Sequence, residues 1–318
     1  MTAAVTQLNR APSPRRQSIP VPWVKLAGAG NDFVLIDTAQ AGLSRLRREW
    51  PALARWLCDR RMGIGADGLL ILEPRRVGTV RMRIFNPDGS EPSMCGNGIR
   101  CVASIAHRHG HAGTTVRIQT RAGLRRAEIL GRHRVRVHMG RPRLLKAFAD
   151  VALEHGHTAQ AALVDSGVPH LVCWVEDVAA LDVNTLGRRL RHHPQLGPAG
   201  ANVDFLQWAA APPQGGARAR VLLRMRTYER GVEAETQACG TGAVAAAAAA
   251  CTRLLEQPAR RTRARLSLEA AVQVPGGILR VDIGARRGRG LQFLPATLEG
   301  EARLLTQGTA LWNGRHMR

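Results

Sequence analysis

The 318-residue sequence lacks several features that would assign it to common protein classes. It contains no run of about 18 apolar residues, so it predicts no membrane-spanning helix. No two cysteines are spaced as C-x-x-C, which argues against zinc, and we expect no metal site. Aromatic residues make up only 4% of the chain, and lysine occurs only as Lys25 and Lys146, so nearly all basic residues are arginines.

Arginine accounts for most of a formal net charge of +22, a balance that is typical of nucleic-acid-binding proteins. The arginines are nevertheless spread along the whole chain instead of being gathered in one stripe, and few aromatic residues accompany them. We therefore interpret the charge as a compositional bias and expect no specific nucleic-acid partner. A basic nucleic-acid-binding protein remains the less favoured alternative.

The cysteine content also indicates in which cellular compartment the protein is expected. An even number of cysteines suggests disulfides in a small secreted domain, but this chain is long. Residues 1–20 carry arginines without the apolar segment of a secretion signal, and we expect them to be a disordered extension. We therefore expect free thiols in a cytoplasmic protein. The six cysteines are Cys58, Cys95, Cys101, Cys173, Cys239 and Cys251.

The length fits about two domains. We expect an N-terminal half over residues 21–141, a C-terminal half over 142–298, and a tail, 299–318, that joins the N-terminal half. Helical spacing covers residues 44–62, and further helices are expected from Cys95 to about His109 and from Cys239 to about Leu255. Strands are expected at 21–26, 33–37, 69–73, 80–85, 116–120, 127–130, 135–139, 162–165, 171–175, 203–208, 221–228, 271–275, 278–282 and 302–305.

An internal repeat links the two halves. The first copy reads M-R-I-F-N-P-D-G-S-E-P-S-M-C-G-N-G, and the second reads M-R-T-Y-E-R-G-V-E-A-E-T-Q-A-C-G-T-G. Cys95 follows Met82 by 13 residues, and Cys239 follows Met225 by 14. Each copy predicts a strand, a polar turn, Cys-Gly-x-Gly and a helix. The sequence therefore predicts two similar α/β halves that each offer one cysteine to a shared cleft.

A cysteine at the start of a helix lies where unpaired N–H groups and the helix dipole favour the thiolate. Inverting a stereocentre needs a base on one face of the carbon and an acid on the other, and two opposed thiols would supply both. The same N–H groups can bind a carboxylate, so neither pyridoxal phosphate nor a metal is required. A single cysteine before glycine is more often a packing residue, but two matched copies favour an amino-acid epimerase. The other four cysteines lack this context and are assigned to packing.

Several ordered motifs resemble the diaminopimelate epimerase family over nearly the whole chain from Val21 to about Leu305. They are K-L-A-G-A-G-N-D-F (25–33), G-I-G-A-D-G-L (63–69), the Cys95 repeat with I-R-C (82–101), P-H (169–170), N-V-D-F (202–205), Y-E-R-G (228–231) and A-C-G-T-G (238–242). The resemblance implies interconversion of LL- and meso-diaminopimelate, a step toward lysine and peptidoglycan, without a cofactor. It also implies an α/β (α+β) fold of two pseudo-symmetric domains, each a curled, mostly antiparallel sheet around a central helix, in a homodimer.

The resemblance further implies a role for individual residues. Cys95 and Cys239 would be the acid–base thiols, and His170 and Glu229 would tune their pKa values. The remaining implied substrate-binding residues hold the reacting carboxylate through backbone amides or bind the distal amino and carboxylate groups of the amino acid. They are Gly96, Asn97, Gly240 and Thr241 for the reacting carboxylate, and Asn31, Asn86, Asn202, Glu229 and Arg230 for the rest of the substrate.

Two departures from the family pattern concern the distal end of the substrate. Val168 stands where the family commonly has an asparagine that helps to hold the distal carboxylate, and valine cannot donate a hydrogen bond. Losing such a contact to a charged group costs about 1.5–3 kcal/mol. The stretch between Arg230 and Cys239 is one residue longer than its commonest form. A related cysteine racemase for histidine, proline or hydroxyproline therefore stays open as an alternative.

Overall fold

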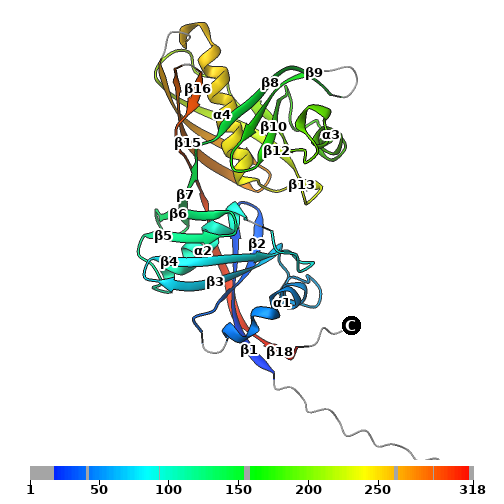
Figure 1. Ribbon diagram of the computed structural model, residues 1–318, viewed down its shortest axis with the longest axis vertical. Coiled ribbons are helices and arrows are strands. Elements are labelled where there is room, and N and C mark those ends of the chain that lie inside the picture. Colours follow the sequence, from blue (N-terminus) through cyan, green and yellow to red (C-terminus); the bar gives the residue numbers. More distant parts are fainter. Residues whose placement is uncertain are drawn as a thin grey trace, which may run out of the picture.

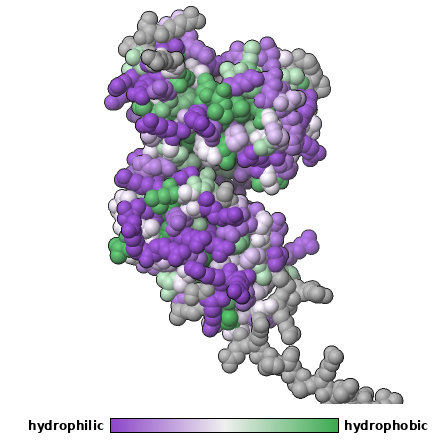
Figure 2. All heavy atoms as spheres, in the orientation of Figure 1, coloured by the Kyte–Doolittle hydropathy of each residue, from purple (hydrophilic) through white to green (hydrophobic). Residues whose placement is uncertain are grey.

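The computed structural model describes residues 18–40, 43–92, 94–153, 158–260, 264–288 and 290–314. Two lobes are stacked along the long axis of the molecule (Figure 1). On the face shown in Figure 2, hydrophilic side chains cover both lobes and are interrupted by smaller apolar areas. None of the helices in the described part of the chain combines the length and apolar character that crossing a membrane requires.

The first lobe contains the elements up to β7 and the last strand. Its elements are β1 (Ile19–Gly28), β2 (Asn31–Asp37), η1 (Leu43–Arg48), α1 (Trp50–Leu57), β3 (Gly68–Arg76), β4 (Thr79–Phe85), α2 (Gly96–Arg108), β5 (Thr115–Thr120), β6 (Gly123–Ile129), β7 (Arg134–Gly140) and β18 (Arg303–Trp312). Strand β18 returns from the end of the chain and pairs antiparallel with β1, where Ile19 lies opposite Trp312.

The second lobe contains most of the remaining elements. They are β8 (Arg143–Ala152), β9 (Thr158–Asp165), β10 (Pro169–Trp174), α3 (Val183–Arg191), η2 (Pro194–Leu196), β11 (Asn202–Trp208), β12 (Arg218–Glu229), β13 (Ala234–Thr236), α4 (Gly240–Glu256), η3 (Pro258–Arg260), β14 (Arg265–Val274), β15 (Gly277–Arg287) and β16 (Leu291–Phe293). Strand β17 (Ala296–Glu301) pairs with both β15 and β7, so the strands of the two lobes form one continuous sheet among the described residues.

The sequence repeat is matched by a repeat of strand pairing. In the first lobe, β1–β2 and β3–β4 are antiparallel, while β2–β3 and β4–β5 are parallel and are crossed by α1 and α2. In the second lobe, β9–β10 and β11–β12 are antiparallel, while β10–β11 and β12–β14 are parallel and are crossed by α3 and α4. The expected α/β (α+β) fold of two similar halves is therefore confirmed, whereas the boundary between residues 141 and 142 stays a prediction.

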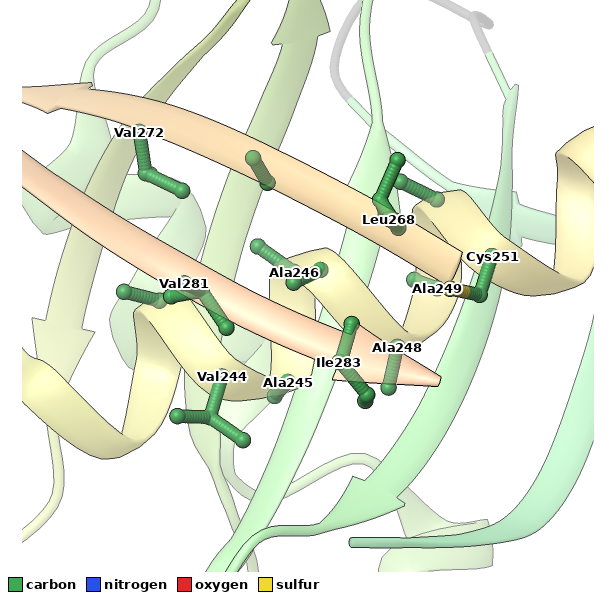
Figure 3. Close-up of a cluster of buried hydrophobic side chains, with 14 of the residues drawn as sticks. Val244, Ala245, Ala246, Ala248, Ala249, Cys251, Leu268, Val272, Val281 and Ile283 are labelled. Atoms are coloured by element: carbon green, nitrogen blue, oxygen red, sulfur yellow. The ribbon is translucent and has the colours of Figure 1, made fainter. Parts of the chain in front are cut away.

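Each sheet curls around one buried helix. Along α2, Ile99, Val102 and Ile105 are fully buried among the strands of the first lobe. Helix α4 is buried on all sides from Gly240 to Cys251, as expected for a segment that is apolar all round, and its polar residues Arg253 and Glu256 lie in the less buried last turns. Its run of alanines lets β14 and β15 approach the helix closely, as Figure 3 shows for Leu268 and Val281.

Some expected boundaries were wrong. The helix expected over 44–62 is instead η1 followed by the short α1, because the chain turns back and the amides of Ile64 and Gly65 bond the carbonyl of Leu57. Strand β1 begins inside the segment expected to be disordered, and residues 1–17 lie outside the described residues. Strand β8, which begins after the expected boundary between residues 141 and 142, was not expected, because most of its side chains are exposed and show no alternation; the boundary itself stays a prediction.

We expect the close packing around α4 to make a larger side chain costly. Ala246 is fully buried, so Ala246→Leu should lower the free energy of unfolding by about 1–3 kcal/mol in urea denaturation. Ala149 is exposed on β8, and Ala149→Leu should change the free energy of unfolding by no more than about 0.5 kcal/mol. Equal effects of the two substitutions would contradict a tightly packed helix.

Candidate active site

The first turns of α2 and α4 meet between the two lobes. A methyl group built on Gly96 would lie 3.8 Å from the Cα of Gly240, and one built on Gly240 would lie 3.8 Å from the Cα of Gly96. Cys95 and Cys239 are the N-cap residues of these helices, both with extended backbone angles. The structure therefore brings together the two Cys-Gly-x-Gly turns that the sequence repeat singles out.

The two thiols have different surroundings. Cys95 is partly buried, and its Sγ accepts a hydrogen bond from the amide of Gly98 at 3.4 Å. Burial raises the pKa of the Cys95 thiol, and this amide opposes the rise. Cys239 is 6% exposed. Burial raises the pKa of its thiol well above the usual value, and the carboxylates of Glu229 and Asp204 raise it further.

A buried polar chain leads from Cys239 into the second lobe. The Sγ of Cys239 lies 3.4 Å from the hydroxyl of Thr241, which lies 2.9 Å from Nε2 of His170. Nδ1 of His170 lies 2.7 Å from a carboxylate oxygen of Asp204, and Thr227 donates to the other oxygen at 2.7 Å. The expected proximity of His170 to the site is observed, through Thr241. Asp204 was missed because N-V-D-F reads as an ordinary strand.

Asn202, Glu229 and Arg230 lie beside this chain. The side-chain oxygen of Asn202 accepts a hydrogen bond from the backbone amide of Arg230 at 2.8 Å. The side-chain NH₂ group of Asn202 donates to the backbone carbonyl of Pro169 at 3.3 Å. The guanidinium of Arg230 donates to the Gly200 carbonyl at 3.4 Å. Burial raises the pKa of Glu229, so this carboxyl group holds its proton more readily than an exposed glutamate.

On the first lobe, Asn31 is tied to the start of α2. Asn97 donates to the side-chain oxygen of Asn31 at 2.6 Å and lies 3.5 Å from the Ala238 carbonyl of the other lobe. Asn31 in turn donates to Asp67 at 3.0 Å. The amide of Asn97 therefore connects Asn31 with the residue that precedes Cys239.

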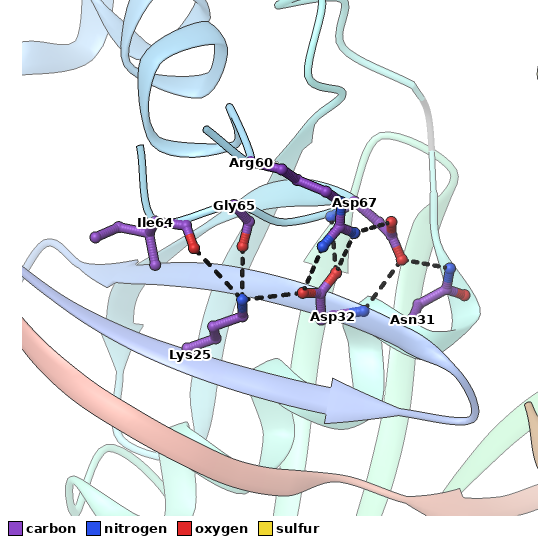
Figure 4. Close-up of polar contacts among 7 residues, drawn as sticks. All are labelled: Lys25, Asn31, Asp32, Arg60, Ile64, Gly65 and Asp67. Atoms are coloured by element: carbon purple, nitrogen blue, oxygen red, sulfur yellow. Dashed lines mark hydrogen bonds and ion pairs between the residues drawn. The ribbon is translucent and has the colours of Figure 1, made fainter. Parts of the chain in front are cut away.

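Charged residues fix the position of Asn31 (Figure 4). Asp32 forms ion pairs with Lys25 at 3.1 Å and with Arg60 at 2.9 Å, and Arg60 also contacts Asp67 at 2.7 Å. These four residues were not among the expected site residues, although the motifs K-L-A-G-A-G-N-D-F and G-I-G-A-D-G-L contain three of them. Their role in the structure is to hold the two loops together.

Asn86 and Val168 lie in loops. Asn86 bonds Ser90 twice, through its backbone amide and its side-chain amide, both at 2.9 Å, and so closes the N-P-D-G-S turn. The carbonyl of Val168 accepts from the amide of Ser166 at 3.2 Å, and its side chain is partly exposed. Neither contact joins these residues to the two thiols.

The other thiols and one polar cluster lie apart from this site. Burial raises the pKa of Cys58, Cys101 and Cys251 to about 12 each, and it also raises the pKa of Cys173. Among the described residues, one cluster has the chemistry of metal ligands: Asp37, His109 and His111, whose ligand atoms lie within 4.8 Å of one another. It lies at the far end of α2, where both imidazoles contact one Asp37 oxygen.

The sequence matches the family model described as diaminopimelate epimerase over residues 23–145 and 162–292. A diaminopimelate epimerase of Moorella thermoacetica is 44% identical over 243 residues, which cover 71% of this chain and 82% of the relative. One of Desulforudis audaxviator is 41% identical over 276 residues, which cover 82% of this chain and 90% of the relative.

Solved structures show a similar fold at much lower identity. A phenazine biosynthesis protein of the PhzF family from Bacillus anthracis has a TM-score of 0.62 at 14% identity, over 92% of this chain and 99% of that chain. A hydroxyproline epimerase from Agrobacterium vitis has a TM-score of 0.59 at 16% identity, over 92% and 93% of the two chains. The sequence matches carry the assignment: the chain belongs to the diaminopimelate epimerase family, and it is an isomerase.

Proposed function

We propose that this protein interconverts LL- and meso-diaminopimelate by moving the α-proton between Cys95 and Cys239. One observation carries the proposal: the two Cys-Gly-x-Gly turns face each other, and each has a cysteine at the N-cap of its helix. A methyl group built on Gly96 or Gly240 would lie 3.8 Å from the Cα of the other glycine. One carbon held between these turns would have a thiol on each face.

The chemistry follows from this arrangement. One thiolate removes the α-proton, so that a C–H bond breaks and an S–H bond forms, and the opposite thiol donates its proton to the other face of the carbon. Negative charge builds up on the α-carboxylate during the transfer. The backbone N–H groups of Gly96, Asn97, Gly240 and Thr241 would hold this carboxylate, and two helix dipoles would stabilise the charge without a cofactor.

The remaining site residues would bind the rest of the substrate. The fixed orientations of Asn31 and Asn202 support their assignment to substrate binding. In each residue the side-chain oxygen accepts one hydrogen bond and the side-chain NH₂ group donates another. Glu229 ends β12, Arg230 follows it and donates to Asn202, and Asn86 lies in the turn after β4. His170 and Glu229 would tune the two thiols, His170 acting through Thr241.

The proposal extends to the setting of the enzyme. Diaminopimelate is a precursor of lysine and of peptidoglycan, so we place the reaction in these two biosynthetic routes. We also propose a cytoplasmic homodimer whose subunits consist of an N-terminal half, 21–141 with the tail 299–318, and a C-terminal half, 142–298. The pairing of β18 with β1 supports the inclusion of the tail in the N-terminal half.

Loss of either thiol tests the acid–base assignment. Cys95→Ala and Cys239→Ala should each lower kcat for epimerisation by about 10²–10⁴-fold, since general acid–base groups contribute this much. Incorporation of deuterium at the α-carbon in D₂O, without added pyridoxal phosphate, measures the same step. Cys58→Ala changes a buried packing thiol and serves as the control, with turnover close to that of the wild type. Near-normal turnover in either Cys95→Ala or Cys239→Ala would show that the proton moves by another route.

Val168 tests recognition of the distal carboxylate. Val168→Asn would add a hydrogen-bond donor, so the KM for diaminopimelate should fall by about tenfold or more at unchanged kcat, as about 1.4 kcal/mol gives a factor of ten. The wild type and Val168→Asn are both screened against stereoisomers of diaminopimelate, proline, hydroxyproline and histidine, and their turnover is compared. Turnover of one of these in place of diaminopimelate would contradict the proposed substrate.

A further inference from the structure

One carboxylate and two imidazoles converge at the end of α2 opposite to the thiols. Asp37 ends β2, His109 is the C-cap residue of α2, and His111 lies in the loop that leads to β5. One ligand atom from each of the three side chains lies within 4.8 Å of the other two. Helix α2 has 13 residues, so at about 1.5 Å per residue the cluster lies about 20 Å from Cys95. It therefore does not belong to the site of the proposed reaction.

Asp37 carries a buried charge without a permanent cation beside it. It is 5% exposed, and its ion-pair partners among the described residues are His109 at 2.8 Å and His111 at 2.6 Å. Burial raises the pKa of Asp37, but hydrogen bonds from the two imidazoles and the Ala39 amide outweigh this effect and lower the pKa. Asp37 is therefore a carboxylate near neutral pH, and a buried carboxylate requires an opposite charge.

Another histidine–carboxylate pair in the first lobe provides a comparison. Glu128 contacts one imidazole, that of His138 at 3.0 Å, and it also forms an ion pair with Arg126 at 2.9 Å. Asp37 instead has two imidazoles on its Oδ2 atom, while its Oδ1 atom accepts from the Ala39 amide at 3.0 Å. A proton on one imidazole would compensate the charge of Asp37, but it would leave the second imidazole without a role. Two imidazoles and a carboxylate together favour a metal ion.

The backbone fixes the loop that carries the second histidine. Gly110 separates the two histidines and has φ of +77°, a left-handed conformation that suits glycine at the end of a helix. The His111 amide donates to the Ala106 carbonyl at 2.8 Å, and the His111 carbonyl accepts from the Gly78 amide at 3.0 Å. The loop is thus held both by α2 and by the turn between β3 and β4, and the ligand atoms are brought together before any metal binds.

The ligand atoms suit a divalent transition metal. Zinc binds imidazole through Nδ1 or Nε2 and also binds carboxylate oxygen, and here His109 offers Nδ1 and His111 offers Nε2. Ligands at about 2.0–2.1 Å from a tetrahedral metal lie roughly 3.3 Å apart, so each imidazole would move away from Asp37 by roughly half an ångström. His109 is exposed and His111 is partly exposed, so both rings can make this shift. The Ala39 amide orients the carboxylate from behind.

We propose that Asp37, His109 and His111 bind a divalent transition-metal ion of the zinc class, with water at the remaining position. The metal compensates the buried charge of Asp37 and ties the end of α2 to β2, where the negative end of the helix dipole also favours a cation. The site stabilises the first lobe and takes no part in proton transfer. Our expectation of no metal site rested on cysteine spacing, which does not report on nitrogen and oxygen ligands.

Metal binding is measured on the full chain with Co²⁺ and Zn²⁺ as probes. Cys95→Ala and Cys239→Ala are combined in this protein, so that the thiols between the lobes cannot bind the metal. We expect one equivalent of Co²⁺ in equilibrium dialysis, with visible d–d absorption and no thiolate charge-transfer band, and we expect Zn²⁺ to displace it. The melting temperature should rise with Zn²⁺ concentration, because a ligand of the folded state stabilises it. Absence of a one-to-one complex would overturn the proposal.

Substitution of the histidines locates the site. His109→Gln combined with His111→Gln should weaken metal affinity by more than the about 10–100-fold that loss of an outer-shell partner costs, and should remove the rise in melting temperature. His107→Gln is the matched control, because His107 belongs to the same histidine-rich segment but its Nδ1 contacts the carbonyls of Ala112 and Gly113. We expect this variant to bind metal like its parent. Equal weakening by His107→Gln would indicate a run of surface histidines instead of the proposed site.

Substitution of the carboxylate tests the third ligand. Asp37→Asn keeps the shape of the side chain and removes its charge, so metal affinity should fall by more than tenfold, whereas Glu128→Gln in the comparison pair should leave it unchanged. Unchanged affinity in Asp37→Asn would contradict the three-ligand site. If Asp37→Asn does not fold, the histidine variants still decide the proposal.

Activity separates this site from the proposed function. In a protein with both thiols intact, His109→Gln combined with His111→Gln should exchange the α-proton of diaminopimelate in D₂O at the rate of the wild type. A tenfold or greater loss of exchange in this folded variant would contradict a purely structural site. Metal binding in a wild-type protein that exchanges no α-proton would contradict the proposed function and leave the metal site standing.

Discussion

The structure depends on the close approach of two helix N-termini. Each helix carries unpaired N–H groups and a partial positive charge at its start, so two such ends placed together repel each other until an anion lies between them. Gly96 and Gly240 face each other at this approach, and a methyl group built on either would already be in van der Waals contact with the Cα of the other. Both helices are buried in their own lobe for most of their length, and the proposed function assigns their shared N-terminal region to the substrate carboxylate.

The sequence predicted the parts of the molecule that local pattern controls. The repeat and the Cys-Gly-x-Gly turns predicted where α2 and α4 begin, and alternating residues predicted most strands. Contacts between distant segments could not be predicted in this way. Asp67 meets Asn31 because the parallel strands β2 and β3 begin side by side, and Asp204 meets His170 because the parallel strands β10 and β11 are neighbours. Residues such as Arg100, which lie inside a helix, also look like ordinary packing positions until their burial is known.

The duplicated architecture does not make the two halves chemically equal. Strand order and helix position are repeated, but the side chains that approach each thiol are not. Leu70 and Asp204 occupy corresponding places against the second glycine of each motif, and one is neutral while the other is charged. The repeated backbone thus places a thiol at the start of each central helix, while a few buried residues that differ between the lobes give the two thiols different surroundings.

The connection between the lobes has a mechanical consequence. The chain leaves the first lobe after β7 and re-enters it after β17, and these two strands pair side by side at the narrow neck (Figure 1). The two crossing segments are therefore tied to each other by the hydrogen bonds of a β-ladder. A slide of one lobe along these strands would break that ladder, so the pairing resists it.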